Sequence, residues 1–123
     1  MNTKLLLIAT AIFELATGIA LLVTPSLIVE LLLGEGLGSA ASIVVSRVAG
    51  SALIAIGITS WLGRDTNRGA SQMGLLVGLL TYNCAVPVIL TSAAMVSGMH
   101  GIALWPAVIL HSLLALWCIV CLR

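Results

Sequence analysis

Four stretches of the chain are almost continuously apolar and long enough to cross a lipid bilayer. They run over residues 4–23, 40–62, 74–96 and 102–122. A hydrocarbon core about 30 Å thick takes roughly 20 residues at about 1.5 Å of rise each. Backbone polar groups inside lipid must bond within their own segment, so each stretch is predicted to be a helix. The pattern predicts an all-α polytopic membrane protein, a single antiparallel four-helix domain over residues 1–123.

A shorter apolar segment, residues 25–33, follows the first span and is predicted to be a helix that lies along the membrane interface. Thr24 is a suitable N-cap, Pro25 is tolerated in a first turn, and Gly34 is suited to end the helix. The segment is too short to span, and its acid, Glu30, is expected to face headgroups or water.

Composition changes the picture by excluding other classes of protein. Hydrophobic residues make up 61% of the 123 residues and charged residues 7%, against usual values of about 45–50% and about 25%. Nine charged side chains do not cover the surface of a soluble domain of this size. A net charge of +1 argues against an electrostatic nucleic-acid binder, so membrane lipid is the expected surrounding.

Basic residues predict the orientation in the membrane. Four of them flank the spans at one end of the bundle: Lys4, Arg64, Arg68 and Arg123. The loops at the other end, around Glu35 and His100, carry no lysine or arginine. The positive-inside rule therefore predicts an inner-membrane protein with both termini in the cytoplasm.

Polar residues within the four spans form the candidate site. Lipid penalises unpaired charge, so Glu14 of the first span and Arg47 of the second are predicted to pair across the interior. Asn83 and His111, from the third and fourth spans, are predicted to join this cluster, with Tyr82 as a further member. If the side chain of Glu14 or Arg47 faces lipid instead, the prediction of a site built on this charged pair is wrong.

Two functions of different classes are consistent with this pattern. In the first, the protein is not an enzyme, and the five residues bind or translocate a small ligand or relay a proton, since histidine titrates near neutral pH. In the second, the same residues hold together an accessory or scaffolding subunit of a larger complex. Both readings predict a homo-oligomer or a partner, because glycine faces at Gly50, Gly57, Gly74 and Gly78 suit helix contacts. No catalytic residue, cofactor or metal site is predicted.

The pair Cys118 and Cys121, in the sequence C-I-V-C, resembles the thiol centre of vitamin K epoxide reductase and its bacterial relatives. That resemblance implies a membrane thiol or quinone redox protein, which also needs a second cysteine pair. The remaining cysteine, Cys84, stands alone in the third span. Redox chemistry is therefore a distant third alternative, and small apolar packing is the favoured role of these cysteines.

Two further resemblances cover little more than the first span and about half of the chain, respectively. The acid in A-I-F-E-L-A-T-G, Glu14, resembles the proton- and cation-binding acid of the small multidrug resistance transporters, although their third-helix signature is replaced by G-L-L-T-Y-N-C-A-V-P. The chain is more similar to small bacterial four-helix membrane proteins of the DoxX-like type. The segments T-G-I-A-L-L-V-T-P and R-V-A-G-S-A-L-I-A-I-G carry that resemblance, which implies a four-helix membrane fold and no single activity.

Overall fold

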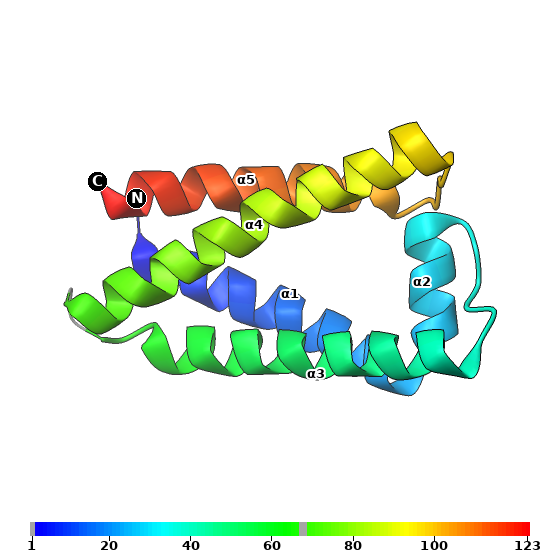
Figure 1. Cartoon of the computed structure of the whole chain (residues 1–123). Coiled ribbons are helices and arrows are strands. Elements are labelled where there is room, and N and C mark those ends of the chain that lie inside the picture. Colours follow the sequence, from blue (N-terminus) through cyan, green and yellow to red (C-terminus); the bar gives the residue numbers. More distant parts are fainter. Residues whose placement is uncertain (1, 67–68) are drawn as a thin grey trace.

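The computed structural model describes residues 2–66 and 69–123, which fold into five helices (Figure 1). They are α1 (Thr3–Val23), α2 (Pro25–Leu33), α3 (Ala40–Gly63), α4 (Ala70–Ser97) and α5 (Leu104–Leu122). The predicted all-α class is confirmed. The third span begins at residue 70 and not at 74, because polar residues continue the helix beyond its apolar part, and the fourth begins at 104 and not at 102.

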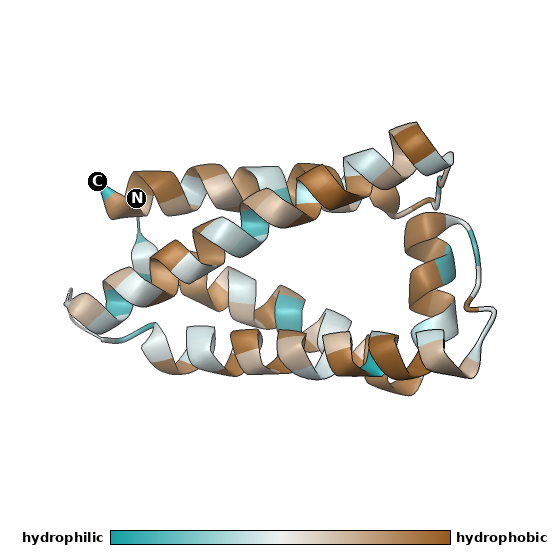
Figure 2. Cartoon of the chain, viewed as in Figure 1, coloured by the Kyte–Doolittle hydropathy of each residue, from teal (hydrophilic) through white to brown (hydrophobic). Residues whose placement is uncertain are grey.

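The four long helices are long and apolar enough to cross a membrane. Apolar positions cover them along their length (Figure 2). Many large hydrophobic side chains point outward, with Val45 67% exposed and Val96 82% exposed. Exposed apolar surface on this scale is incompatible with water and suits acyl chains. The chain is therefore an integral, multi-pass membrane protein.

Local chemistry explains where several helices begin and end. Ser39 and Ser42 form a reciprocal capping box at the start of α3. Gly34 ends α2 in the left-handed region at φ 80°, where a side chain would be strained. Thr24 is the N-cap residue of α2, as expected, but its side chain makes no capping hydrogen bond to that helix. Its hydroxyl instead donates to the carbonyl of Ala20 at 3.1 Å and so closes α1.

The helices α1 and α3 pack at very close range through glycine. A Cβ built on Gly18 would lie 2.7 Å from the carbonyl oxygen of Gly50, and one on Gly50 would lie equally close to that of Gly18. A Cβ on Gly57 would lie 2.6 Å from the Leu15 side chain. The predicted contact at Gly50 and Gly57 is thus present within the chain. By contrast, Gly74 and Gly78 on α4 have open space where a Cβ would stand, so they make no helix contact here.

The other close pair is α4 with α5, and a hydrophobic cluster joins these helices to α1. The cluster occupies the end of the bundle where both termini lie (Figure 1). The buried cysteines of α5 belong to it, as the packing role expected for them requires. Its buried members are Leu6, Leu7, Leu76, Leu79, Leu114, Cys118 and Cys121.

At the opposite end, the short helix α2 lies across the long helices (Figure 1). Backbone hydrogen bonds attach it to the segment before α5: His100 N–H donates to the carbonyl of Leu33 at 3.0 Å, and Ala103 N–H donates to that of Leu31 at 2.8 Å. Gly101 permits this contact, because a Cβ there would lie 2.2 Å from the Leu31 carbonyl oxygen. The predicted helix over residues 25–33 is confirmed, and it closes one end of the bundle.

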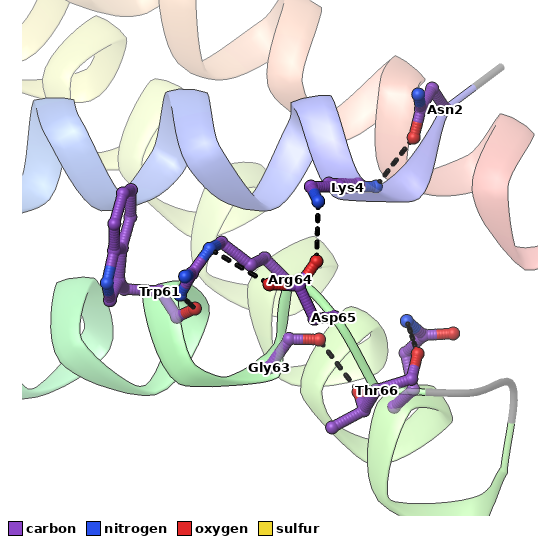
Figure 3. Close-up of polar contacts among 8 residues, drawn as sticks. Asn2, Lys4, Trp61, Gly63, Arg64, Asp65 and Thr66 are labelled. Carbon is purple, nitrogen blue, oxygen red and sulfur yellow. Dashed lines mark hydrogen bonds and ion pairs between the residues drawn. The ribbon is translucent and has the colours of Figure 1, made fainter.

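Charged residues gather at the end that holds the termini. Lys4 Nζ lies 2.6 Å from Asp65 Oδ1, and Arg64 Nε lies 3.3 Å from Asp65 Oδ2 (Figure 3). Arg64 also covers the Trp61 ring, 3.9 Å from its centroid, and donates to the Trp61 carbonyl (Figure 3). The structure therefore brings Lys4 and Arg64 to one end, as predicted, whereas Arg68 lies outside the described residues.

The ion pair between Lys4 and Asp65 predicts a pH-dependent contribution to stability. The hydrogen bond from Lys4 lowers the pKa of Asp65 below its ordinary value of 3.8. The pair therefore stabilises the fold above the unfolded pKa and loses that effect as the pH falls through the folded one. We expect Asp65→Asn to lower the melting temperature slightly at neutral pH, since the pair is exposed. The difference from the parent protein should vanish well below pH 3.8, and a constant difference would contradict this.

Candidate functional site

Four polar side chains from α1, α4 and α5 meet near the middle of the bundle. The hydroxyl of Tyr82 donates to Glu14 Oε2 at 3.2 Å, and His111 Nδ1 lies 2.8 Å from Asn83 Oδ1. The rings of Tyr82 and His111 meet edge to face, with centroids 5.4 Å apart. Glu14 is 3% exposed and Asn83 is fully buried. These four residues are called the polar cluster below.

Helical geometry explains how neighbouring residues serve both halves of the polar cluster. Tyr82 and Asn83 follow one another on α4, so their side chains leave the helix about 100° apart. Tyr82 thereby reaches Glu14 on α1, while Asn83 reaches His111 on α5. Asn83 also donates from Nδ2 to the carbonyl of Leu79, one turn back, at 2.8 Å. Both the nitrogen and the oxygen of the Asn83 side-chain amide are thus hydrogen-bonded.

Arg47 does not join the polar cluster, and the predicted pair with Glu14 is wrong. Its side chain is exposed, and no ion pair to either residue occurs within 2–66 and 69–123. The antiparallel register is the reason. Because Gly50 lies beside Gly18, Arg47 lies near the level of Leu21, about 10 Å along α1 from Glu14. The site therefore has no internal cation and differs from the charged pair expected from the sequence.

A cavity of about 490 Å³ extends from the polar cluster toward α2. All five helices contribute to its wall, which is mainly apolar. Tyr82 and His111 line it, and Thr17 of α1 supplies the remaining polar side chain of the wall. Glu14 and Asn83 lie behind these rings and are not part of the lining. The chemistry offered is a hydrocarbon-like chamber with hydrogen-bonding groups at its inner end.

The sequence did not reveal that α2 forms part of the wall of this cavity. Four of its apolar residues form wall: Ile28, Val29, Leu31 and Leu32. The segment was expected to rest on lipid, and its apolar run is equally suited to covering an opening between helices. Thr17 also forms part of the wall. It follows Glu14 by three positions on the same helix face, which the spacing predicts to point inward, but it was not among the candidate site residues.

The other candidate groups lie away from the polar cluster. Cys118 and Cys121 are buried in the hydrophobic cluster, while Cys84 is exposed on α4. His100 lies in the segment before α5, where its Nδ1 contacts the Gly98 carbonyl. Among residues 2–66 and 69–123, no group of three or more His, Cys, Asp or Glu side chains is placed to hold a metal ion.

Comparisons with protein-family models, with curated proteins and with solved structures find no match for this chain. The DoxX-like resemblance therefore stays a prediction. Its two segments contain Gly18, Gly50 and Gly57, which are the residues that let α1 and α3 approach closely.

Proposed function

We propose that this membrane protein binds a small, mainly apolar ligand in the cavity between α2 and the polar cluster. The observation that carries the proposal is the cavity itself, about 490 Å³ lined by Tyr82 and His111. Ligand pockets are typically of this size, apolar, and provided with a few convergent polar groups. Intramembrane polar residues also commonly mark ligand or ion pathways. The absence of Arg47 from the site makes a neutral polar end the better fit than a charged one.

The remaining half of the bundle supports binding in preference to a through-going channel. The hydrophobic cluster of leucines and cysteines lies beyond the polar cluster, toward the end that holds the termini. A separate pocket of about 390 Å³ opens at that end, beside Leu76 and Cys121, and it shares no lining residue with the cavity under α2. We further propose that the end with Lys4, Arg64 and Arg123 faces the cytoplasm, on the basis of the positive-inside rule, so that α2 and the cavity lie toward the outer side.

Photolabelling of the protein in lipid nanodiscs tests the binding proposal. The probe is octanol carrying a diazirine in its chain, and mass spectrometry locates the labelled residues. We expect labelling to concentrate on the cavity wall. Ala107→Phe should reduce it, because Ala107 lines the cavity one turn before His111 and phenylalanine would fill the space.

The matched control is Ala85→Phe, since Ala85 is exposed on α4 and lies outside the wall. It should leave cavity labelling unchanged. Equal labelling of the wall and of the outer helix faces, unaffected by Ala107→Phe in folded protein, would show that the probe samples only lipid-exposed surface and would exclude the proposed site.

A second candidate function, self-assembly or service as a subunit of a complex, is favoured by one observation. Arg47 is exposed seven residues inside α3, and no partner for its guanidinium occurs among the residues that the structure describes. Lipid strongly disfavours such a charge. Glu30 on α2 is likewise exposed and without an ion pair in the same described residues. A second copy of this chain would supply the missing carboxylate.

A further inference from the structure

The Asn83 amide determines which nitrogen of His111 carries a hydrogen. Asn83 Nδ2 donates to the Leu79 carbonyl at 2.8 Å, so Oδ1 faces His111. The opposite amide orientation would set Oδ1 against the Leu79 carbonyl, and two acceptors make no hydrogen bond. Since Oδ1 only accepts, His111 Nδ1 is the donor. In the neutral imidazole, Nε2 then holds a lone pair and is an acceptor.

The hydrogen bond that Tyr82 donates likewise determines what its hydroxyl oxygen offers to a ligand. Its hydroxyl hydrogen goes to Glu14 Oε2, at an oxygen-to-oxygen distance of 3.2 Å. What the Tyr82 oxygen retains for another partner is a lone pair. Glu14 itself, at 3% exposure, lies behind Tyr82 and is not part of the cavity wall. Its carboxyl group therefore acts on a ligand through the orientation of the tyrosine hydroxyl.

The inner end of the cavity consequently presents two acceptors. No hydrogen bond to Nε2 of His111 occurs among residues 2–66 and 69–123. Thr17, the other polar side chain of the wall, has a hydroxyl that donates or accepts as required. A ligand that brings only a carbonyl or ether oxygen is able to accept from Thr17, but it leaves His111 Nε2 and the Tyr82 oxygen without a donor. Such mismatches of buried polar groups discriminate strongly between otherwise similar ligands.

We infer that the ligand is a lipophile whose polar group is a hydroxyl, and that this hydroxyl donates to Nε2 of His111. The inference rests on the proposed binding function and adds the chemical class of the ligand. A hydroxyl fits better than an ammonium group, because no carboxylate lines the cavity wall. Its oxygen is also able to accept from Thr17. Asn83 and Glu14 are positioning residues, since each acts through the ring in front of it.

Competition against the photoprobe tests this ligand class in the unmodified protein. Unlabelled octanol, heptyl methyl ether and octylamine have chains of matched length and differ in their polar group. Octanol should reduce cavity labelling at a concentration about tenfold below that needed for the ether, because one buried hydrogen bond to an otherwise unpaired acceptor is worth about 1–2 kcal/mol. The concentrations are corrected for partition of each compound into nanodiscs without protein.

The possible outcomes separate this inference from the proposed function. Equal competition by octanol and ether, with labelling still in the cavity, would overturn the hydroxyl assignment and leave ligand binding standing. Stronger competition by octylamine would replace the hydroxyl with an ammonium group and would likewise overturn it. Failure to label the cavity at all would remove the proposed function together with the inference.

A variant then assigns the preference to His111. His111→Phe keeps an aromatic ring in the wall and removes the acceptor. In this variant, octanol and the ether should compete equally while the cavity is still labelled. Retention of the full octanol preference by the folded variant would show that Nε2 is not the recognising atom. The comparison in the unmodified protein stands even if this variant folds poorly.

Discussion

Gly50→Ala is expected to destabilise the protein by about 1–3 kcal/mol, the usual cost of forcing an extra carbon into a close-packed contact. The added Cβ would lie 2.7 Å from the backbone carbonyl oxygen of Gly18. A backbone atom cannot rotate away as a flexible side chain does, so α1 and α3 must separate. The free energy of unfolding, measured by denaturant titration in mixed micelles, reports the loss.

The same substitution at Gly78 provides the control, because a Cβ there meets nothing within 4 Å. Gly78→Ala should be neutral or slightly stabilising, since alanine favours a helix over glycine by about 1 kcal/mol. Equal stability of the two variants would mean that α1 and α3 do not approach as closely as described. Separation of α1 from α3 in Gly50→Ala would also change the shape of the cavity, because residues of α1 and Leu53 of α3 both form its wall.

Arg47→Leu is expected to make insertion of α3 more favourable by about 2–3 kcal/mol. An arginine near a helix centre costs about 2.5–3.5 kcal/mol to insert, whereas leucine is favourable. Arg47 lies seven residues inside α3 and away from its centre, and long cationic side chains near a helix end reach the interface, which lowers this cost. Glycosylation mapping of α3 insertion measures this effect. Arg47→Lys retains the charge and should insert like the parent helix.

The same variant decides between a lone charge and an interface. If Arg47 pairs with Glu30 of a second copy, Arg47→Leu should yield monomers in single-molecule photobleaching of protein in bilayers. Arg47→Glu should do the same, and adding Glu30→Arg should restore the assembly by exchanging the two charges. An oligomeric state that is unchanged by Arg47→Leu would exclude this interface, whereas a monomeric parent protein would exclude the self-assembly candidate.

Much of the architecture was predictable from the sequence because lipid imposes simple requirements. A bilayer demands about 20 apolar residues per span and internal backbone bonding, so the four long helices followed from hydropathy alone. Pro25 and Gly34 likewise marked the short helix α2 to the residue. The grouping of Glu14, Tyr82, Asn83 and His111 was also anticipated, since buried polar groups must find partners.

The partner of each polar group was decided by packing. Glu14 and Arg47 lie on neighbouring helices, yet the register set by Gly18 and Gly50 separates them by about 10 Å. Their opposite charges predicted that they would pair. Charge does not determine the register of α1 against α3, however, and that register decides which residues lie side by side. Glu14 instead accepts from Tyr82, a neutral donor 68 positions away in the chain.

The sequence by itself determined a membrane protein of four spanning helices with polar residues at mid-depth, because hydropathy and helix rise are local properties. The tertiary structure alone decided that leucines and cysteines pack together in one half of the bundle while a half-open cavity lies under α2 in the other. Whether helices enclose space depends on their crossing and separation. These follow from contacts between residues far apart in sequence, such as Gly18 with Gly50 and Gly101 with Leu31.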